Sequence, residues 1–287
     1  MHIPDGMITG TICPVTTAVA AVGASAATYF AYREKNKPTA LQFGAVSAFI
    51  FAAQMMNFAI SKGTSGHFLG GVLAVALLGV PFGILAMTLV LILQCCVFAD
   101  GGISVLGANV INMALVGAGA GGILVWARKQ NSVIWSAVLA WFSVVCAAWA
   151  CSIQLTLAGA AAYGTVTKAM LSTHALIGIG EAVITGAVVF AAHVTKVSST
   201  RMSYAILIFA ALIATCFSPF ACGSPDGLEW VAHKYNFVND QPAYIVGIFA
   251  DYSVAVIRHE GFSTACAGFA GVIMTLLTGL GCARVLK

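Results

Sequence analysis

Long apolar runs dominate this sequence and leave too few charges to coat a water-exposed surface. Only 8% of the 287 residues are charged, whereas 60% are hydrophobic and the mean hydropathy is +0.97. Soluble domains carry about 25% charged residues, and a helix needs about 20 apolar residues to cross a bilayer. We therefore predict an all-α, polytopic membrane protein. A soluble enzyme, a nucleic-acid-binding module and a β-barrel, whose strands would alternate in polarity, are excluded.

Basic breaks between the apolar segments indicate the topology. The apolar segments are 8–32, 41–60, 70–98, 104–127, 132–157, 175–194, 203–221 and 264–283. The basic breaks are 33–37, 128–129, 196–201 and 284–287, which the positive-inside rule places in the cytoplasm. One crossing per segment would put 33–37 and 128–129 on opposite sides. All four breaks share a side if 70–98, about 43 Å long as one helix, crosses twice with a break near Pro81.

The resulting topology has about nine transmembrane helices in the cytoplasmic (inner) membrane. The N-terminus is then extracytoplasmic and the C-terminus cytoplasmic, with outer loops at 61–70, 99–103, 158–174 and 222–262. A single tilted helix over 70–98, with Arg128 and Lys129 on the wrong side, is the alternative. The pattern of apolar and polar residues changes after Arg201, where two apolar segments flank a long polar loop. We therefore expect two modules, residues 1–200 with seven helices and residues 201–287 with two.

The first two residues can chelate a metal ion. The opening MHIPDG lacks the basic region of a signal peptide, so we expect the mature chain to begin at Met1. The Met1 amine, the His2 amide and Nδ1 of His2 would form fused five- and six-membered chelate rings with an open fourth in-plane position. Planar nitrogen coordination suits Ni(II) or Cu(II) better than zinc. The Pro4-Asp5-Gly6 turn would let the chain double back.

A further histidine lies in a short predicted outer loop. His67 follows Gly66, which allows close backbone approach, and it would supply the fourth nitrogen. On spacing alone a second interpretation stays open, in which His2 belongs to a frayed tail and His67 is an interfacial histidine. Ionisable groups inside a membrane are costly and tend to be functional. His174 and Glu181, which share one helix face, are therefore candidates for the outer shell of the metal, and so is Asp5. The alternative for His174 and Glu181 is a hydrogen-bonded pair that only packs the helices.

Other polar residues in the apolar runs have simpler interpretations. Gln54, Asn57, Asn109 and Asn112 are expected to hold helices together by hydrogen bonds. Asp100 is expected to form an outer turn. The 222–262 loop carries Asp226, Glu229 and His233, which would attract cations or belong to a solvated loop. The sequence contains no G-x-x-x-x-G-K-[ST] phosphate-binding loop, so we expect no nucleotide hydrolysis by this chain.

Four motifs resemble one transporter family. They are Met1 to Gly6, Gly63 to Gly70, Gly107 to Met113 and His174 to Thr185. Together they are similar to the CbiM/NikM family, the substrate-binding (S) components of energy-coupling-factor transporters for cobalt and nickel. Ser224 to Ala232 resembles the PDGLE signature of the accessory component CbiN/NikN, here fused to the first module.

The resemblance implies an S-component fold with an extra N-terminal helix. It also implies metal ligands at Met1, His2 and His67. The function implied is import of Ni(II) or Co(II), with nickel favoured, driven by a transmembrane coupling subunit and separate ATP-binding subunits. An ion-coupled secondary transporter or channel without ATPase partners is the first alternative. A membrane assembly or sensor protein with an incidental His2 is the second.

Overall fold

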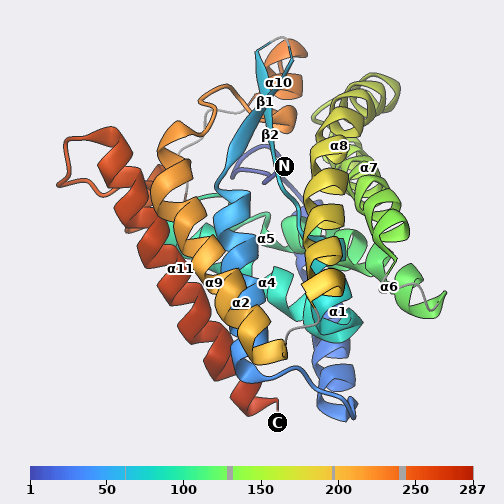
Figure 1. Cartoon of the computed structure of the whole chain (residues 1–287). Coiled ribbons are helices and arrows are strands. Elements are labelled where there is room, and N and C mark those ends of the chain that lie inside the picture. The colour runs from blue at the N-terminus through green and yellow to red at the C-terminus, as the bar shows by residue number, and fades with distance from the viewer. Residues whose placement is uncertain (62, 128–131, 196–197, 239–243, 287) are drawn as a thin grey trace.

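The computed structural model describes the chain except residues 62, 128–131, 196–197, 239–243 and 287. It is a bundle of helices with one small β-ribbon at one end (Figure 1). The helices in the first two thirds are α1 (Ile12–Arg33), α2 (Ala40–Gln54), α3 (Gly71–Leu78), α4 (Val80–Phe98), α5 (Leu106–Asn109), η1 (Val110–Ala118), α6 (Gly119–Trp126), α7 (Val133–Leu157) and α8 (Tyr163–Thr195). The last third contains α9 (Ser199–Leu212), η2 (Ile213–Phe217), η3 (Ser218–Phe220), α10 (Gly227–Lys234), η4 (Ala250–Tyr252) and α11 (Glu260–Val285).

The structure confirms the predicted helical membrane bundle. Within the described residues, seven helical stretches are long and apolar enough to cross a bilayer, counting 106–126 and 199–220 as continuous. The α2 helix is also apolar but has only 15 residues. The predicted total of about nine crossings is therefore not confirmed.

The apolar segment 70–98 is broken in two. Gly79 lies between α3 and α4 with φ +82°, a left-handed conformation that side-chain-bearing residues rarely adopt. Pro81 then occupies the first turn of α4, where its missing N–H is harmless. However, α3 has only eight residues, or about 12 Å of helix, so it is too short to cross the membrane alone.

Two sequence-based boundaries were wrong. The segment 41–60 was expected to be helical throughout, but α2 ends at Gln54 and β1 (Asn57–Ser61) follows. This strand pairs antiparallel with β2 (Thr64–His67), so that Asn57 faces His67. A short apolar run cannot distinguish strand from helix by periodicity alone. The expected outer loop 158–174 shrinks to 158–162, because α8 begins at Tyr163.

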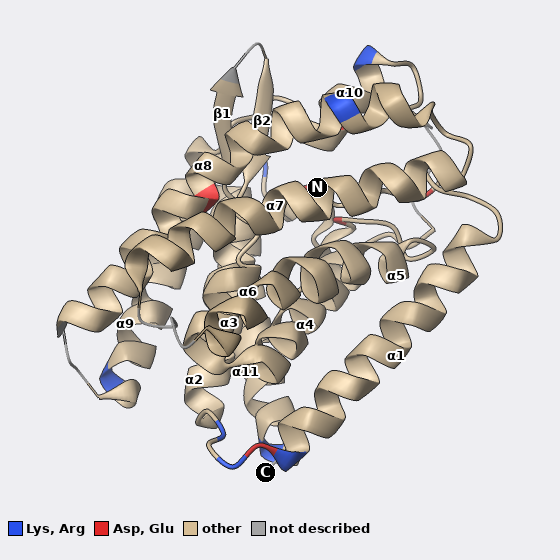
Figure 2. Cartoon of the chain, turned by 90° about the vertical axis from the view of Figure 1, so that its right-hand side faces the viewer, with Lys and Arg blue, Asp and Glu red and all other residues tan. Residues whose placement is uncertain are grey.

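The two ends of the bundle differ in character. At one end, the Lys37 ammonium donates to the carbonyl oxygen of Leu286 at 2.6 Å, so the 33–37 loop lies beside the C-terminus. In Figure 2 the ribbon beside the C-terminus carries basic residues, in blue, around a red acidic segment. The predicted basic positions Arg128, Lys129, Lys196 and Lys287 lie outside the described residues. The opposite end carries the β-ribbon and α10 (Figure 1). The orientation of the bundle in the membrane stays a prediction.

The C-terminal segment, residues 201–287, packs on one flank of the bundle. Its helices α9 and α11 both contact α2. Between them, the chain returns to the β-ribbon end, where the backbone N–H of Cys222 donates to the Asn57 carbonyl at 2.8 Å. The segment thereby reaches the same end of the molecule as the N-terminus.

Candidate metal centre

The N-terminal residues are folded into the end of the bundle. Met1 is 5% exposed, His2 9% and Ile3 fully buried. The side chain of Asn109 anchors them, since its Oδ1 accepts from the Ile3 N–H at 2.8 Å and its Nδ2 donates to the Ile3 carbonyl at 3.1 Å. A Cβ added to Gly102 would overlap the backbone and carboxylate of Asp5. The hairpin therefore fits its slot only because residue 102 has no side chain.

The terminal amine of Met1 meets the imidazole of His67. The Met1 nitrogen is in hydrogen-bond contact with Nε2 of His67. The rings of His67 and His2 stack with centroids 5.1 Å apart. The structure thus brings together the three residues that the sequence analysis chose as ligands, and their role in metal binding remains a prediction.

His67 is prepared to act as a neutral nitrogen donor. Its Nδ1 lies 3.0 Å from the carbonyl oxygen of Phe68 and so carries the proton, which leaves the Nε2 lone pair directed at Met1. Burial first, then the nearby terminal ammonium and His2, lower the pKa of His67 to about 3. The imidazole is therefore uncharged at neutral pH, the form that ligates metals.

His2 has other partners in this structure. Its Nδ1 lies 3.2 Å from Oδ1 of Asp100, and its Nε2 lies 3.1 Å from Oε1 of Gln94. The Tyr252 hydroxyl donates to the second oxygen of Asp100 at 2.6 Å. Burial lowers the pKa of His2, although Asp100 opposes this. The predicted chelate requires Nδ1 to exchange Asp100 for the metal. Asp100 is thus more than the structural turn expected for it.

The residue that sequence reasoning placed least well is Asp226. Its Oδ2 lies 2.7 Å from the Met1 nitrogen and 3.8 Å from Nε2 of His67. Burial alone would raise the pKa of Asp226, but the terminal ammonium outweighs it through its charge and its hydrogen bond, and holds this pKa well below its usual range. Asp226 and Glu229 form a capping box at the start of α10. The D-x-x-E spacing that signals such a box was visible in the sequence.

The three candidates for the outer shell have different surroundings. Asp5 accepts from the backbone and hydroxyl of Ser104, at 3.0 and 2.6 Å, and so fixes the N-terminal turn. Nδ1 of His174 lies 2.9 Å from the Met170 carbonyl oxygen one turn earlier. Nε2 of His174 is buried without a hydrogen-bond partner among the described residues. His174 also lines a cavity of about 10 Å³ together with Met1, His67 and Asp226.

Glu181 supports the backbone that follows His67. Its two carboxylate oxygens accept from the N–H groups of Leu69 and Gly70 at 2.5 and 2.7 Å. The side chain is fully buried. It therefore bonds to the loop after His67, whereas His174 bonds to its own helix. Asn112, by contrast, pairs with Gln154 through two amide hydrogen bonds, as expected for a helix–helix contact.

We expect Glu181→Gln to destabilise the protein by about 1–3 kcal/mol, because the amide retains one acceptor and leaves one buried N–H unpaired. Thermal or denaturant unfolding in detergent measures this loss. Glu229→Gln, at a partly exposed capping position, serves as the control and should change the unfolding free energy much less. Equal stabilities of the two variants would contradict a supporting role for Glu181.

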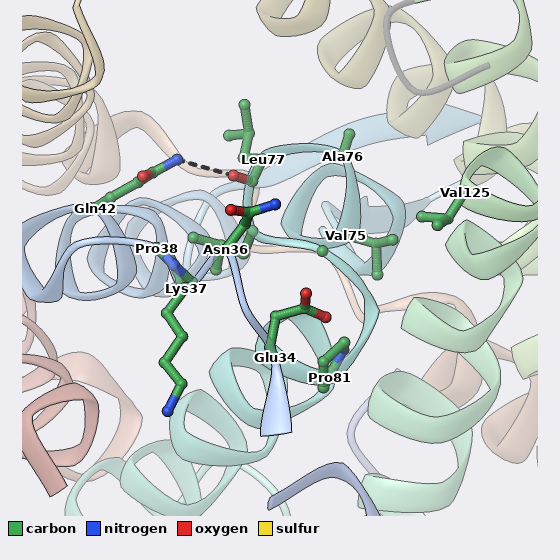
Figure 3. Close-up of a pocket in the computed structure, with 12 residues that line it drawn as sticks. Glu34, Asn36, Lys37, Pro38, Gln42, Val75, Ala76, Leu77, Pro81 and Val125 are labelled. Carbon is green, nitrogen blue, oxygen red and sulfur yellow. Dashed lines mark hydrogen bonds between the residues drawn. The ribbon is translucent and has the colours of Figure 1, made fainter. Parts of the chain in front are cut away.

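A larger cavity lies away from this centre. It has a volume of about 360 Å³ and is lined by Glu34, Asn36, Gln42 and Pro81 among others (Figure 3). Since Arg33 follows Ile12 by 21 positions along the 22-residue helix α1, this cavity lies about 32 Å along that helix from its N-terminal end. None of the residues lining it belongs to the predicted metal site.

The predicted N-terminal centre does not consist of side-chain ligands alone. Among the described residues, no group of three or more His, Cys, Asp and Glu side chains is placed to hold an ion. Two of the four predicted ligands are instead a terminal amine and a backbone amide. Their chemistry depends on the position of Met1 and His2 at the start of the chain.

Comparison with known proteins identifies the family of this chain. Residues 2–201 match the family model CbiM, described as a cobalt uptake substrate-specific transmembrane region. The chain belongs to the CbiM family. Residues 200–287 match a second model, the PDGLE domain. The predicted resemblance is therefore confirmed for both parts of the sequence.

Relatives of this CbiM-family chain are named as metal transport proteins. A protein of Archaeoglobus fulgidus, named as a fused nickel transport protein NikMN, is 36% identical over 298 residues that cover 99% of this chain and 98% of the relative. The cobalt transport protein CbiM of Sorangium cellulosum is 28% identical over 205 residues, which cover 66% and 90% of the two chains. Nickel and cobalt thus both occur among the relatives' names.

Two solved structures share the fold. A transition metal transporter aligns with a TM-score of 0.62 and 30% identity over 71% of this chain and 98% of the other. A truncated transition metal transporter aligns with a TM-score of 0.58 and 34% identity, covering 66% and 97%. This CbiM-family chain is therefore a multi-span membrane protein with a metal transporter fold.

Proposed function

We propose that this chain captures Ni(II) or Co(II) outside the cytoplasmic membrane and passes the ion inward as the substrate-binding component of an energy-coupling-factor importer. The ligands are the Met1 amine, the His2 amide and Nδ1, and Nε2 of His67. The observation that carries the proposal is the buried contact between the Met1 amine and the neutral His67 ring. Isothermal titration of chelator-treated protein with each ion tests it, with one ion bound per chain as the expected result.

The ligand set suits a small, strongly Lewis-acidic ion. In the proposed complex the three nitrogens of Met1 and His2 would lie near one plane and His67 would close it, an arrangement that favours square-planar Ni(II). Loss of the His2 amide proton lowers the net charge of the complex and thus the cost of moving it into low dielectric. We therefore propose nickel as the preferred substrate. Competition titration with cobalt, together with the absorption spectrum of the complex, decides between them.

Proton release should accompany binding. When the metal binds, the terminal ammonium and the His2 amide would each release a proton to the solvent, so about two protons leave per ion. The His67 imidazole releases none, because burial and the nearby terminal ammonium bring its pKa to about 3 and leave the ring neutral at pH 7. Affinity should therefore rise with pH above neutrality. Titration in buffers of different ionisation enthalpy counts the protons, and a count near zero would contradict amine and amide ligation.

Energy for import is proposed to come from partner subunits. A transmembrane coupling subunit and ATP-binding subunits fit a chain that lacks a phosphate-binding loop. Liposomes that contain the chain with these partners should accumulate Ni(II) only when ATP is present. Accumulation by the chain alone, without ATP, would instead favour a secondary transporter or channel.

The chain is proposed to work as two modules, residues 1–200 and 201–287. In the inner membrane, the N-terminal centre would face outward and the basic 33–37 loop inward. Asp5, His174 and Glu181 are proposed to support the ligands from outside the coordination shell, since such partners fix ligand orientation. Protease or thiol labelling from each side of membrane vesicles tests the orientation.

A further inference from the structure

We propose that Asp226 is a positioning residue of the metal centre, whose carboxylate holds the Met1 amine in place before the ion arrives. The C-terminal segment, residues 201–287, thus completes a site whose ligands all come from the first 67 residues. The consequence for metal affinity rests on the proposed function. The effect on the N-terminal segment itself does not depend on metal binding.

The terminal ammonium needs a counter-charge where it lies. Met1 is almost wholly buried, and an unpaired charge in such a place is strongly unfavourable. Other carboxylates near the centre are engaged elsewhere, since Asp5 contacts Ser104 and Asp100 contacts His2 and Tyr252. Among the described residues, Asp226 is the one whose carboxylate pairs with the amine, at 2.7 Å.

The two oxygens of Asp226 have separate tasks. Oδ1 accepts from the backbone N–H groups of Leu228 and Glu229 at 2.8 and 2.9 Å. Oδ2 is thereby left to face the Met1 amine. Because the cap fixes the rotation of the carboxylate, the oxygen that meets the amine is held by the start of α10 rather than by a freely rotating side chain.

The start of α10 is itself fastened to the ribbon that carries His67. The Ser65 N–H donates to the Pro225 carbonyl at 2.9 Å, and its hydroxyl donates to the Ser224 carbonyl at 2.8 Å. On the other side, a Cβ on Gly227 would lie only 2.8 Å from Ile177 and 3.1 Å from the ring of His174. These contacts fix the positions of Asp226 and His67 relative to each other, and both residues contact the Met1 amine.

This arrangement pre-forms the site. When an uncharged side chain replaces Asp226, the metal-free N-terminus loses its counter-charge and can leave its buried position. Metal binding must then order the N-terminal segment as well as ligate the ion. The metal-loaded state cannot relax in this way without giving up ligands. Removing the charge should therefore weaken binding, because a preorganised site avoids the cost of ordering.

The test compares Asp226→Asn with Glu229→Gln in the full chain, in detergent and after treatment with a chelator. Hydrogen–deuterium exchange of the backbone amides of residues 3 and 5–7 should quicken about tenfold or more in Asp226→Asn, because the Ile3 N–H loses its buried setting. Glu229→Gln retains the charge at 226 and should exchange as the wild type does. Ni(II) affinity of Asp226→Asn should fall about 10–100-fold, the range for lost supporting partners.

Asp226→Ser is a second variant that tests whether the effect comes from unfolding of α10, because serine caps a helix without carrying a charge. Faster amide exchange at residues 3 and 5–7 with unchanged exchange in α10 supports the proposal for either variant. Wild-type exchange and wild-type Ni(II) affinity in both variants overturn it. If the wild-type chain binds no Ni(II) but the variants still free the N-terminus, the metal proposal fails and the positioning role stands.

Discussion

Adding two residues, Gly-Ser, before Met1 should abolish Ni(II) binding while leaving the helical bundle folded. The extension turns the terminal amine into an ordinary peptide nitrogen and removes the fused chelate rings. It also forces a longer chain into a slot where Met1 is only 5% exposed. Since losing a mere supporting partner costs 10–100-fold in affinity, losing this ligand should cost more than about 100-fold. Isothermal titration with Ni(II) measures the effect.

The matched control carries the same two residues after Lys287, since the preceding Leu286 contacts Lys37 at the end of the bundle opposite the β-ribbon. It should bind Ni(II) as the wild type does. Circular dichroism and thermal unfolding of both proteins establish that the bundle is intact. Wild-type affinity in the N-terminally extended protein would refute amine ligation, and with it the mechanism proposed for this chain.

The membrane bundle and the pairing of Met1 with His67 could be anticipated from sequence. Apolar runs dictate helices in a bilayer, and a chelate with one open position demands a nearby nitrogen donor. The β-ribbon could not be anticipated, because Phe58 and Ile60 continue an apolar run that also suits a helix. Its pairing nevertheless decides where His67 lies, since Asn57 faces His67 across the ribbon.

The contact of Asp226 with Met1 shows a second limit. These residues are 225 positions apart, and no periodicity links them. The capping pattern predicts that a helix begins at Asp226, but not what the other carboxylate oxygen meets. Asn109 is similar, because an asparagine in an apolar run indicates a helix–helix hydrogen bond. Here it binds the backbone of Ile3 instead. The tertiary contacts of a terminus that folds back onto the protein produce no local sequence pattern from which they could be predicted.

Replacement of His67 tests whether this residue is a metal ligand or only a histidine near the site. We expect His67→Ala to lower Ni(II) affinity by more than about 100-fold, because it removes the donor that closes the plane and not just a supporting partner. His174→Ala removes a ring from the wall of the same small cavity and should lower affinity less, within the 10–100-fold range of outer partners. His233→Ala, on the exposed side of α10, is the neutral control.

We expect the three variants to differ in this order because His67 contacts the terminal amine, His174 lines the same cavity as Met1, and His233 is exposed. The pKa of His67 is about 3, so its Nε2 lone pair is available at neutral pH. A lower affinity of His67→Ala at this pH therefore reports the missing ring and not a protonated histidine. The colour of the nickel complex should also change in His67→Ala, where water replaces nitrogen in the plane. Equal affinities for His67→Ala and His233→Ala would place the fourth donor elsewhere and leave Met1 and His2 as an incomplete chelate.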